Sequence, residues 1–189
     1  MRIRRLLGLC VSLVVGLPAI AGAQDTPKTG IVIAYPAAVG ILWHVSDKVA
    51  IRPEFNLTGS SSSLSGQSVS IDSSAWAVGF GLSALFYMHE QDSLRTYFVP
   101  RFEYTHTSSS NTNSITTTGK TTVGSDTYGG SGAFGAQYGL GKRFALFGEL
   151  GFGFEHRTAD TSGISSGLTG TVGGNTWGLR SGVGVVFYP

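Results

Sequence analysis

Large apolar side chains alternate with small or polar ones along most of the chain, which is the two-residue period of a β-strand. Residues 143–155 show the pattern well, with Phe144, Leu146, Leu150 and Phe152 on one face and Glu149 on the other. A helix would mix these two sets, because its side chains repeat about every 3.6 residues. The sequence therefore predicts a succession of strands, each with one apolar face.

Seven segments carry this alternation clearly and are predicted as strands. They are residues 38–45, 48–58, 75–88, 94–107, 127–140, 143–157 and 176–188. Bacterial membrane barrels have an even number of strands, so an eighth strand is expected. Gly30 to Tyr35 is the candidate for it, with a tight turn at Pro36 and Ala37.

The charged residues within the predicted strands all lie opposite the bulky apolar side chains. They are Arg52, Glu54, Arg95, Arg101, Glu103, Arg143, Glu149, Glu155 and Arg180. A soluble periplasmic ligand-binding barrel, which is the alternative, would turn a hydrophilic face to water. Here the second face is mostly Gly, Ala and Ser, and Gly weakens a solvated strand. The polarity instead predicts an all-β fold, a transmembrane antiparallel up-and-down β-barrel of eight strands.

The connections between the predicted strands alternate between short and long. Residues 46–48, 89–93 and 141–142 form short turns, whereas residues 59–74, 108–126 and 158–175 are long and rich in Ser, Thr, Gly and Asn. Short periplasmic turns and long external loops are the outer-membrane arrangement, so we expect three mobile external loops. Aromatic residues gather at both strand ends, as in interfacial girdles. The inner set is Trp43, Tyr138, Phe144 and Phe187, and the outer set is Tyr35, Trp76, Tyr104, Tyr128, Phe154 and Trp177.

Residues 1–23 have the three parts of a secretory signal peptide: Arg2, Arg4 and Arg5, an apolar core, and an Ala21-Gly22-Ala23 cleavage site. The barrel domain is then residues 24–189. Removing the signal leaves ten basic and eleven acidic residues, which gives no reason to expect nucleic-acid binding. Cys10, the only cysteine, leaves with the signal, so neither disulfides nor thiol chemistry are expected.

Seven of the strand charges are expected to meet inside the barrel as a structural polar network. They are Arg52, Glu54, Arg101, Glu103, Glu149, Glu155 and Arg180. Bare charges there would be costly, so they should form ion pairs. A solid polar core is the preferred interpretation over a gated ion pathway, because an eight-stranded interior is only wide enough for side chains.

On these residues the chain resembles the small eight-stranded bacterial outer-membrane β-barrel proteins of the OmpA/OmpX type, over residues 29–188. The last strand looks like the C-terminal insertion signal of that family, at Arg180, Gly182, Val185 and Phe187, although this chain continues with Tyr188-Pro189. The signal peptide and the barrel polarity predict export and localisation in the bacterial outer membrane, and the resemblance implies insertion by the barrel-assembly machinery. Outer-membrane lipid and lipopolysaccharide would then surround it.

Some barrels of this size modify lipid A with a Ser/His pair, and His106 and His156 lie near Ser108 and Glu155 in the sequence. Catalysis requires the base within hydrogen-bond reach of the hydroxyl, which the sequence does not show. We therefore expect no enzyme and no catalytic residues, and keep a lipid A deacylase or acyltransferase as an alternative. The four histidines are scattered without metal-ligand spacing and cofactor motifs are absent, so no metal residues and no cofactor are expected.

The predicted function is an integral outer-membrane barrel with a filled polar interior and a structural, envelope-integrity or surface-interaction role. Its long loops are candidates for contact with an extracellular partner. A narrow porin-like channel for small solutes is the other alternative.

Overall fold

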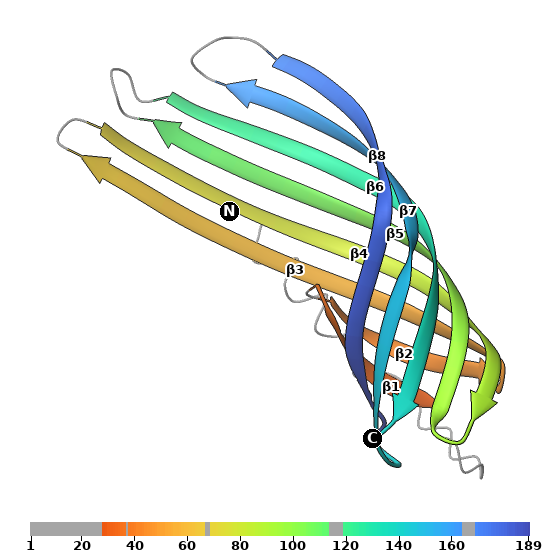
Figure 1. Ribbon diagram of the computed structural model, residues 1–189. Helices are drawn as coiled ribbons and strands as arrows, with labels where there is room; N and C mark the ends of the chain where they lie inside the picture. The colour runs from red at the N-terminus through yellow and green to blue at the C-terminus, as the bar shows by residue number, and fades with distance from the viewer. Residues whose placement is uncertain (1–27, 37, 67–68, 114–118, 164–168) are drawn as a thin grey trace.

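The structure is a computed structural model, and it describes residues 28–36, 38–66, 69–113, 119–163 and 169–189. Eight strands follow in order: β1 (Thr29–Tyr35), β2 (Ala38–Ser46), β3 (Val49–Gly66), β4 (Val69–Gln91), β5 (Leu94–Asn113), β6 (Gly119–Gly139), β7 (Phe144–Gly163) and β8 (Thr169–Phe187). Each strand pairs antiparallel with the next, and β8 pairs with β1, which closes the barrel (Figure 1). The predicted fold class and strand number are confirmed.

The predicted signal peptide, residues 1–23 with Cys10, lies outside the described residues. Within the described ranges, no helix has the length and apolar character that a membrane span requires.

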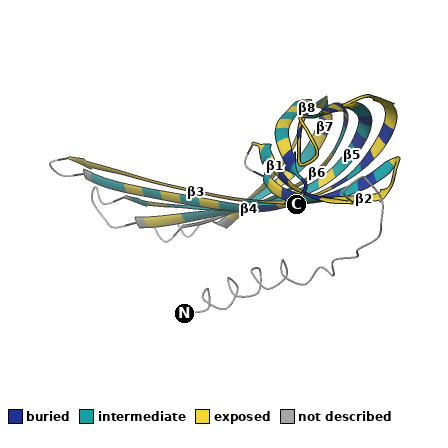
Figure 2. Cartoon of the chain, turned by 90° about the horizontal axis from the view of Figure 1, so that it is seen from below, coloured by how far each residue is buried: buried dark blue, intermediate teal, exposed yellow. Residues whose placement is uncertain are grey.

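The two faces of each strand point as the alternation predicts. Phe152 and Leu82 are 51% and 44% exposed on the outer surface, whereas Arg52 and Tyr97 are 1% and 0% exposed inside. Buried and exposed residues alternate along the strands of the closed barrel (Figure 2). A wall of apolar side chains around buried charges is the polarity of a transmembrane barrel rather than of a soluble one.

Small residues on the inner face let the strands close around a narrow interior. A Cβ atom at Gly151 would clash with the carbonyl oxygen of Gly132 and lie 2.5 Å from Cβ of Ala133. Gly148, on the outer face of the same strand, has no neighbour within 4 Å of such an atom. Glycine inside the barrel is therefore a packing requirement.

The three predicted long loops are wrong in their extent, because most of these residues are paired strand. The pairing of β3 with β4 continues without interruption to Gly66 and Val69, and that of β5 with β6 continues to Asn113 and Gly119. Stretches of Ser and Thr show no apolar alternation, so the sequence does not mark them as strands. Backbone hydrogen bonds between strands do not depend on apolar side chains, and the pairing of each hairpin therefore continues through these residues. Figure 1 shows the result, in which β3 to β8 project together as an extension beyond the barrel.

The β1–β2 hairpin is much shorter than the other strand pairs, so one side of the wall is low. β1 meets β8 only from Ile31 against Phe187 to Tyr35 against Val183. Tyr35 was expected in the outer aromatic set, but it lies beside Val183, six positions short of Trp177 on β8. Above this hairpin, the described residues of β3 and β8 each pair with a described strand on one side only, which leaves two free edges.

Candidate functional site

Four of the predicted interior charges form one buried network, which we call the lower cluster: Arg52 and Glu54 on β3, Arg101 on β5 and Glu149 on β7. Arg52 donates two hydrogen bonds to the Glu149 carboxylate, at 2.7 and 3.1 Å. Its Nε atom lies 3.3 Å from Glu54. Arg101 is 2.9 Å from Glu54 and 3.4 Å from Glu149, so two cations and two carboxylates alternate around a ring.

Neighbouring side chains hold the lower cluster in place. The Tyr97 hydroxyl donates to Glu149 at 2.9 Å, and Arg101 donates through Nε to the Ser83 hydroxyl at 3.0 Å. The Arg52 guanidinium also lies 5.0 Å from the centre of the Phe147 ring. Only 2% of the Arg52 side chain and 6% of that of Glu149 are exposed, so the cluster fills the lumen at this level.

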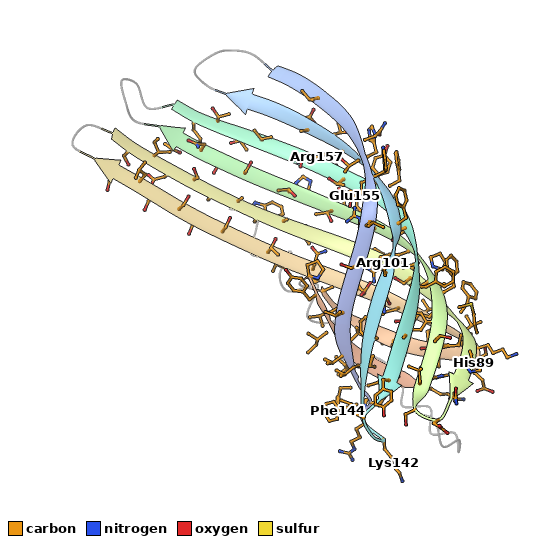
Figure 3. The ribbon with its side chains drawn as sticks, viewed as in Figure 1. His89, Arg101, Lys142, Phe144, Glu155 and Arg157 are labelled. Atoms are coloured by element: carbon orange, nitrogen blue, oxygen red, sulfur yellow. The ribbon has the colours of Figure 1, made fainter. Side chains whose placement is uncertain are left out.

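The other three predicted charges form a separate upper cluster nearer the extension. Arg180 contacts Glu155 closely and lies 3.8 Å from Glu103. These side chains keep between a quarter and two fifths of their surface exposed, because the low β1–β2 wall stands beside them. Figure 3 labels Arg101 and Glu155 at these successive heights in the barrel. The structure therefore brings the seven charges together as two groups rather than one.

A third polar layer, at the short-turn end, is absent from the sequence prediction. Tyr87 donates to the Gln137 carbonyl at 3.1 Å, and the Gln137 amide donates to the Tyr188 hydroxyl at 2.8 Å. Arg95 lies over the Tyr87 ring at 4.1 Å. The sequence carried one indication of this layer, because the two-residue alternation places Gln137 on the same inner face as the charged residues. His89 and Lys142 lie at this same end of the barrel (Figure 3).

The residues considered for lipid A chemistry do not form a Ser/His pair. Nδ1 of His106 lies 2.7 Å from Asp126, and Nδ1 of His156 lies 2.7 Å from Asn175. The hydroxyl near Nε2 of His156 is that of Thr158, at a long 3.4 Å. Both imidazoles point out of the barrel, away from Glu155. The arrangement supports hydrogen bonding at the outer surface rather than activation of a serine.

The proposed C-terminal signal forms the seam that closes the barrel. Val185 pairs with Ile33, and Phe187 pairs with Ile31. The Phe187 ring packs against Phe144 of β7 at 5.0 Å. Arg180 and Gly182, the first two positions of the motif, lie above this seam on the inner face.

Comparison with known proteins relates the chain to other barrels by fold alone. No family model matches it, and no curated protein matches it. A major outer membrane protein from Thermus thermophilus is similar in structure, with a TM-score of 0.57 and 13% identity over 85% of this chain and 98% of that one. CarO of Acinetobacter baumannii has a TM-score of 0.47 at 14% identity, covering 89% of this chain and 100% of CarO. Ail, the attachment invasion locus protein of Yersinia pestis, has a TM-score of 0.36 at 11% identity, covering 84% and 91%.

The closed ring of eight antiparallel strands, its apolar outer wall and this likeness lead to one conclusion. The chain has the fold of the small eight-stranded outer-membrane β-barrels.

Proposed function

We propose that the chain is an integral barrel of the bacterial outer membrane whose extension mediates contact with partners outside the cell. The interior supports an anchoring role, because the lower cluster fills the lumen with paired side chains. The extension supports the contact role, because it lies beyond the apolar wall. The alternative lipid A-modifying activity has no support in the geometry of His106 or His156.

The observation that carries this proposal is the pair of free strand edges. Among the residues that the structure describes, β3 from Asn56 to Gly66 pairs only with β4, and β8 from Thr169 to Gly182 pairs only with β7. Proteins usually protect such edges with lysine, proline or bulges, because unpaired N–H and C=O groups accept another strand. The β3 edge has no charge and no proline, and the β8 edge carries only Arg180, which points inward. Both edges are therefore competent to bind an extended protein segment by strand addition.

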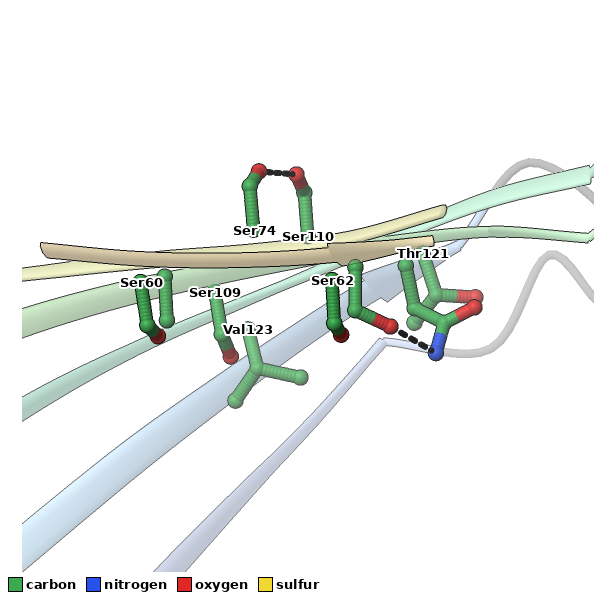
Figure 4. A pocket seen from close by; sticks show the side chains of 10 residues that line it. Ser60, Ser62, Ser74, Ser109, Ser110, Thr121 and Val123 are labelled. Atoms are coloured by element: carbon green, nitrogen blue, oxygen red, sulfur yellow. Dashed lines mark hydrogen bonds between the residues drawn. The ribbon is translucent and has the colours of Figure 1, made fainter. Parts of the chain in front are cut away.

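The faces of the extension suit recognition rather than folding. Ser60, Ser62 and Ser109 line one face, and Ser74 and Ser110 project from the other, where their hydroxyls lie 2.9 Å apart (Figure 4). These short side chains bury little apolar surface. They leave the backbone edges accessible and the faces mostly hydrophilic, with Leu64 and Val172 as exposed apolar exceptions.

The experiment compares bacteria that display the chain with bacteria that display edge variants, on a panel of immobilised extracellular proteins. Ser61→Lys and Gly173→Lys place a charge on the β3 and β8 edges, and Ser110→Lys places the same charge on a central strand as the matched control. We expect retention of the cells to fall with the edge variants and to persist with Ser110→Lys.

Two outcomes would overturn the contact role. One is equal retention of cells with and without the chain on every surface. The other is an equal loss with Ser110→Lys and with the edge variants, since that would show a general effect of charge. The amount of folded barrel in the membrane is measured for each strain, so that poor assembly is not mistaken for lost contact.

A further inference from the structure

A band of polar and aromatic side chains crosses the outer surface where the apolar wall gives way to the extension. We call it the outer-rim band: Tyr104, His106, Asp126, Tyr128, His156 and Asn175. Strand pairing sets them side by side, His106 with Asp126, Tyr104 with Tyr128, and Tyr128 with His156, which in turn pairs with Asn175. All six point away from the barrel axis. Trp76 on β4 and Trp177 on β8 stand at the two ends of the band.

Hydrogen bonds hold the polar members of the band in fixed orientations. Tyr104 donates to Asp126 at 2.6 Å, and Nδ1 of His106 lies 2.7 Å from the same oxygen. Asp126 stands beyond the apolar wall, and these two hydrogen bonds lower the pKa of its carboxyl below the ordinary value. Within the described part of the chain, the second carboxylate oxygen of Asp126 and the amide nitrogen of Asn175 take no part in these hydrogen bonds and can meet a ligand.

The two tyrosine rings of the band are exposed, and its two histidine rings are half-buried against neighbouring rings. Trp76 packs against His106 at 5.4 Å, and Tyr128 packs against His156 at 5.2 Å. Trp177 is 71% exposed, more than any other aromatic ring at this level. A flat ring with one free face suits the C–H face of a sugar, and a nearby carboxylate or amide suits a pair of sugar hydroxyls.

The charge of the band argues against a phosphate ligand. Phosphates in proteins are bound by Arg or Lys, which bring positive charge and several donors. The outer-rim band has neither, and its one full charge is the negative Asp126. The chemistry therefore favours the uncharged hydroxyl groups of a carbohydrate over its phosphate substituents.

Building on the proposed location in the outer membrane, we infer that the outer-rim band binds the sugar headgroup of an outer-leaflet glycolipid. The position of the band along the barrel axis indicates that the sugar belongs to a lipid headgroup. Below it Phe152 and Leu179 face acyl chains, and above it the hydrophilic extension begins, so the band lies at the depth of lipid headgroups. A glycolipid whose tails pack on Leu179 would bring its first sugars to Trp177 and Asn175.

The test uses the purified full barrel in detergent and the three tryptophans of the chain as reporters. Two single-tryptophan variants keep either Trp177 or, as the control, Trp43 at the opposite rim, and the other tryptophans become Phe. The probes are lipopolysaccharide, the same lipopolysaccharide with its phosphates removed, and phosphatidylglycerol, which is anionic but has no sugar. We expect both glycolipids to change Trp177 emission, with little change from phosphatidylglycerol or at Trp43.

Asp126→Ala and Asn175→Ala, each introduced into the variant that keeps Trp177, test whether these two side chains form hydrogen bonds to the sugar. Each should weaken the apparent affinity about tenfold, as expected for loss of one well-placed polar contact. Ser110→Ala, further along the extension on the same face, should leave it unchanged. Binding that disappears with the phosphates, or that is the same for Asp126→Ala and the parent, would overturn the inference. Because the assay uses pure protein, its failure is distinct from failure of the cell-retention experiment.

Discussion

At the scale of single residues, the lower cluster makes Glu149 the most consequential carboxylate of the barrel. Its oxygens accept hydrogen bonds from Arg52, Tyr97 and Arg101. Glu149→Ala would leave Arg52 buried with Glu54 as its remaining charged partner. Breaking a buried ion pair in this way costs about 3–5 kcal/mol of unfolding free energy. We expect a clearly lower midpoint in urea unfolding of the barrel in detergent.

Glu90 supplies the control for that measurement. It pairs with Arg95 at 3.3 Å, but 59% of its side chain is exposed. An exposed pair contributes about 0–1 kcal/mol, so Glu90→Ala should unfold near the parent. Glu103→Ala, in the half-exposed upper cluster, should fall between the two. Equal midpoints for Glu149→Ala and Glu90→Ala would contradict a stabilising interior network.

The glycines of β7 give a second residue-scale prediction with an internal control. Gly151→Ala places a Cβ atom against the backbone of β6, whereas Gly148→Ala points outward into open space. Overpacking of this kind costs about 1–3 kcal/mol. Unfolding in urea should show a lowered midpoint for Gly151→Ala and a midpoint near or above the parent for Gly148→Ala. A lower midpoint for Gly148→Ala than for Gly151→Ala would show that the inner wall accommodates an added methyl group more easily than the spacing of its strands suggests.

At the scale of strands, the sequence predicts which face points inward but not how far a strand continues. The alternation of apolar and polar residues identifies the inner and outer faces of β7 as far as His156. Up to that residue, the inner face points into the barrel and the outer face carries the apolar wall. Along β3 after Leu57, by contrast, almost all residues on both faces are Ser, Thr or Gly, with Leu64 as the exception, so the alternation ends although the ladder continues. Charge pairing is equally hidden, since Arg52 and Glu149 are 97 residues apart and meet through the barrel interior. Only the register of all the strands together brings them into contact.

The free edge of β8 leads to a prediction about amide exchange. Between Thr176 and Gly182 the strand pairs with β7 on one side, and no described strand pairs with it on the other. Every second N–H group therefore lacks a ladder acceptor, because alternate residues of an antiparallel strand turn to opposite neighbours. In detergent these amides should exchange with deuterium much faster than those of β5 between Val99 and Glu103, which is paired on both sides. Uniform protection along β8 would show that another strand occupies the edge.

The last strand also carries the proposed assembly signal, and its two roles can be separated. Phe187→Ala removes the ring that packs against Phe144 and the final residue of the closing seam. We expect less barrel to reach the membrane in cells, while the purified variant still refolds in detergent. Leu179→Ala removes an outward apolar side chain of the same strand outside the motif and should assemble normally. Assembly of Phe187→Ala at the parent level would remove the assembly role.

At the scale of the whole molecule, the polar side-chain layers that follow one another along the barrel axis favour an anchor over a channel. A cavity of about 720 Å³ at the short-turn end is lined by His44, Arg95, Gln137 and Tyr188 among others. It leads to the Tyr87–Gln137–Tyr188 hydrogen bonds, and beyond them the lower cluster spans the interior from β3 to β7. These two successive layers of paired side chains block the lumen. Ions could pass the lower cluster only if its ion pairs separated.

The filled interior predicts that the purified barrel does not conduct ions steadily in a planar bilayer. Opening the path would require Arg52 to leave Glu149 and Glu54 while still buried, which costs several kcal/mol and keeps any open state rare. A water-filled porin reconstituted in the same bilayer serves as the positive control. Steady conductance on the nanosiemens scale would contradict the filled interior and favour the narrow channel. Brief openings that become frequent in Glu149→Gln would instead identify the lower cluster as the barrier, because that change weakens the ion pairs without emptying the lumen.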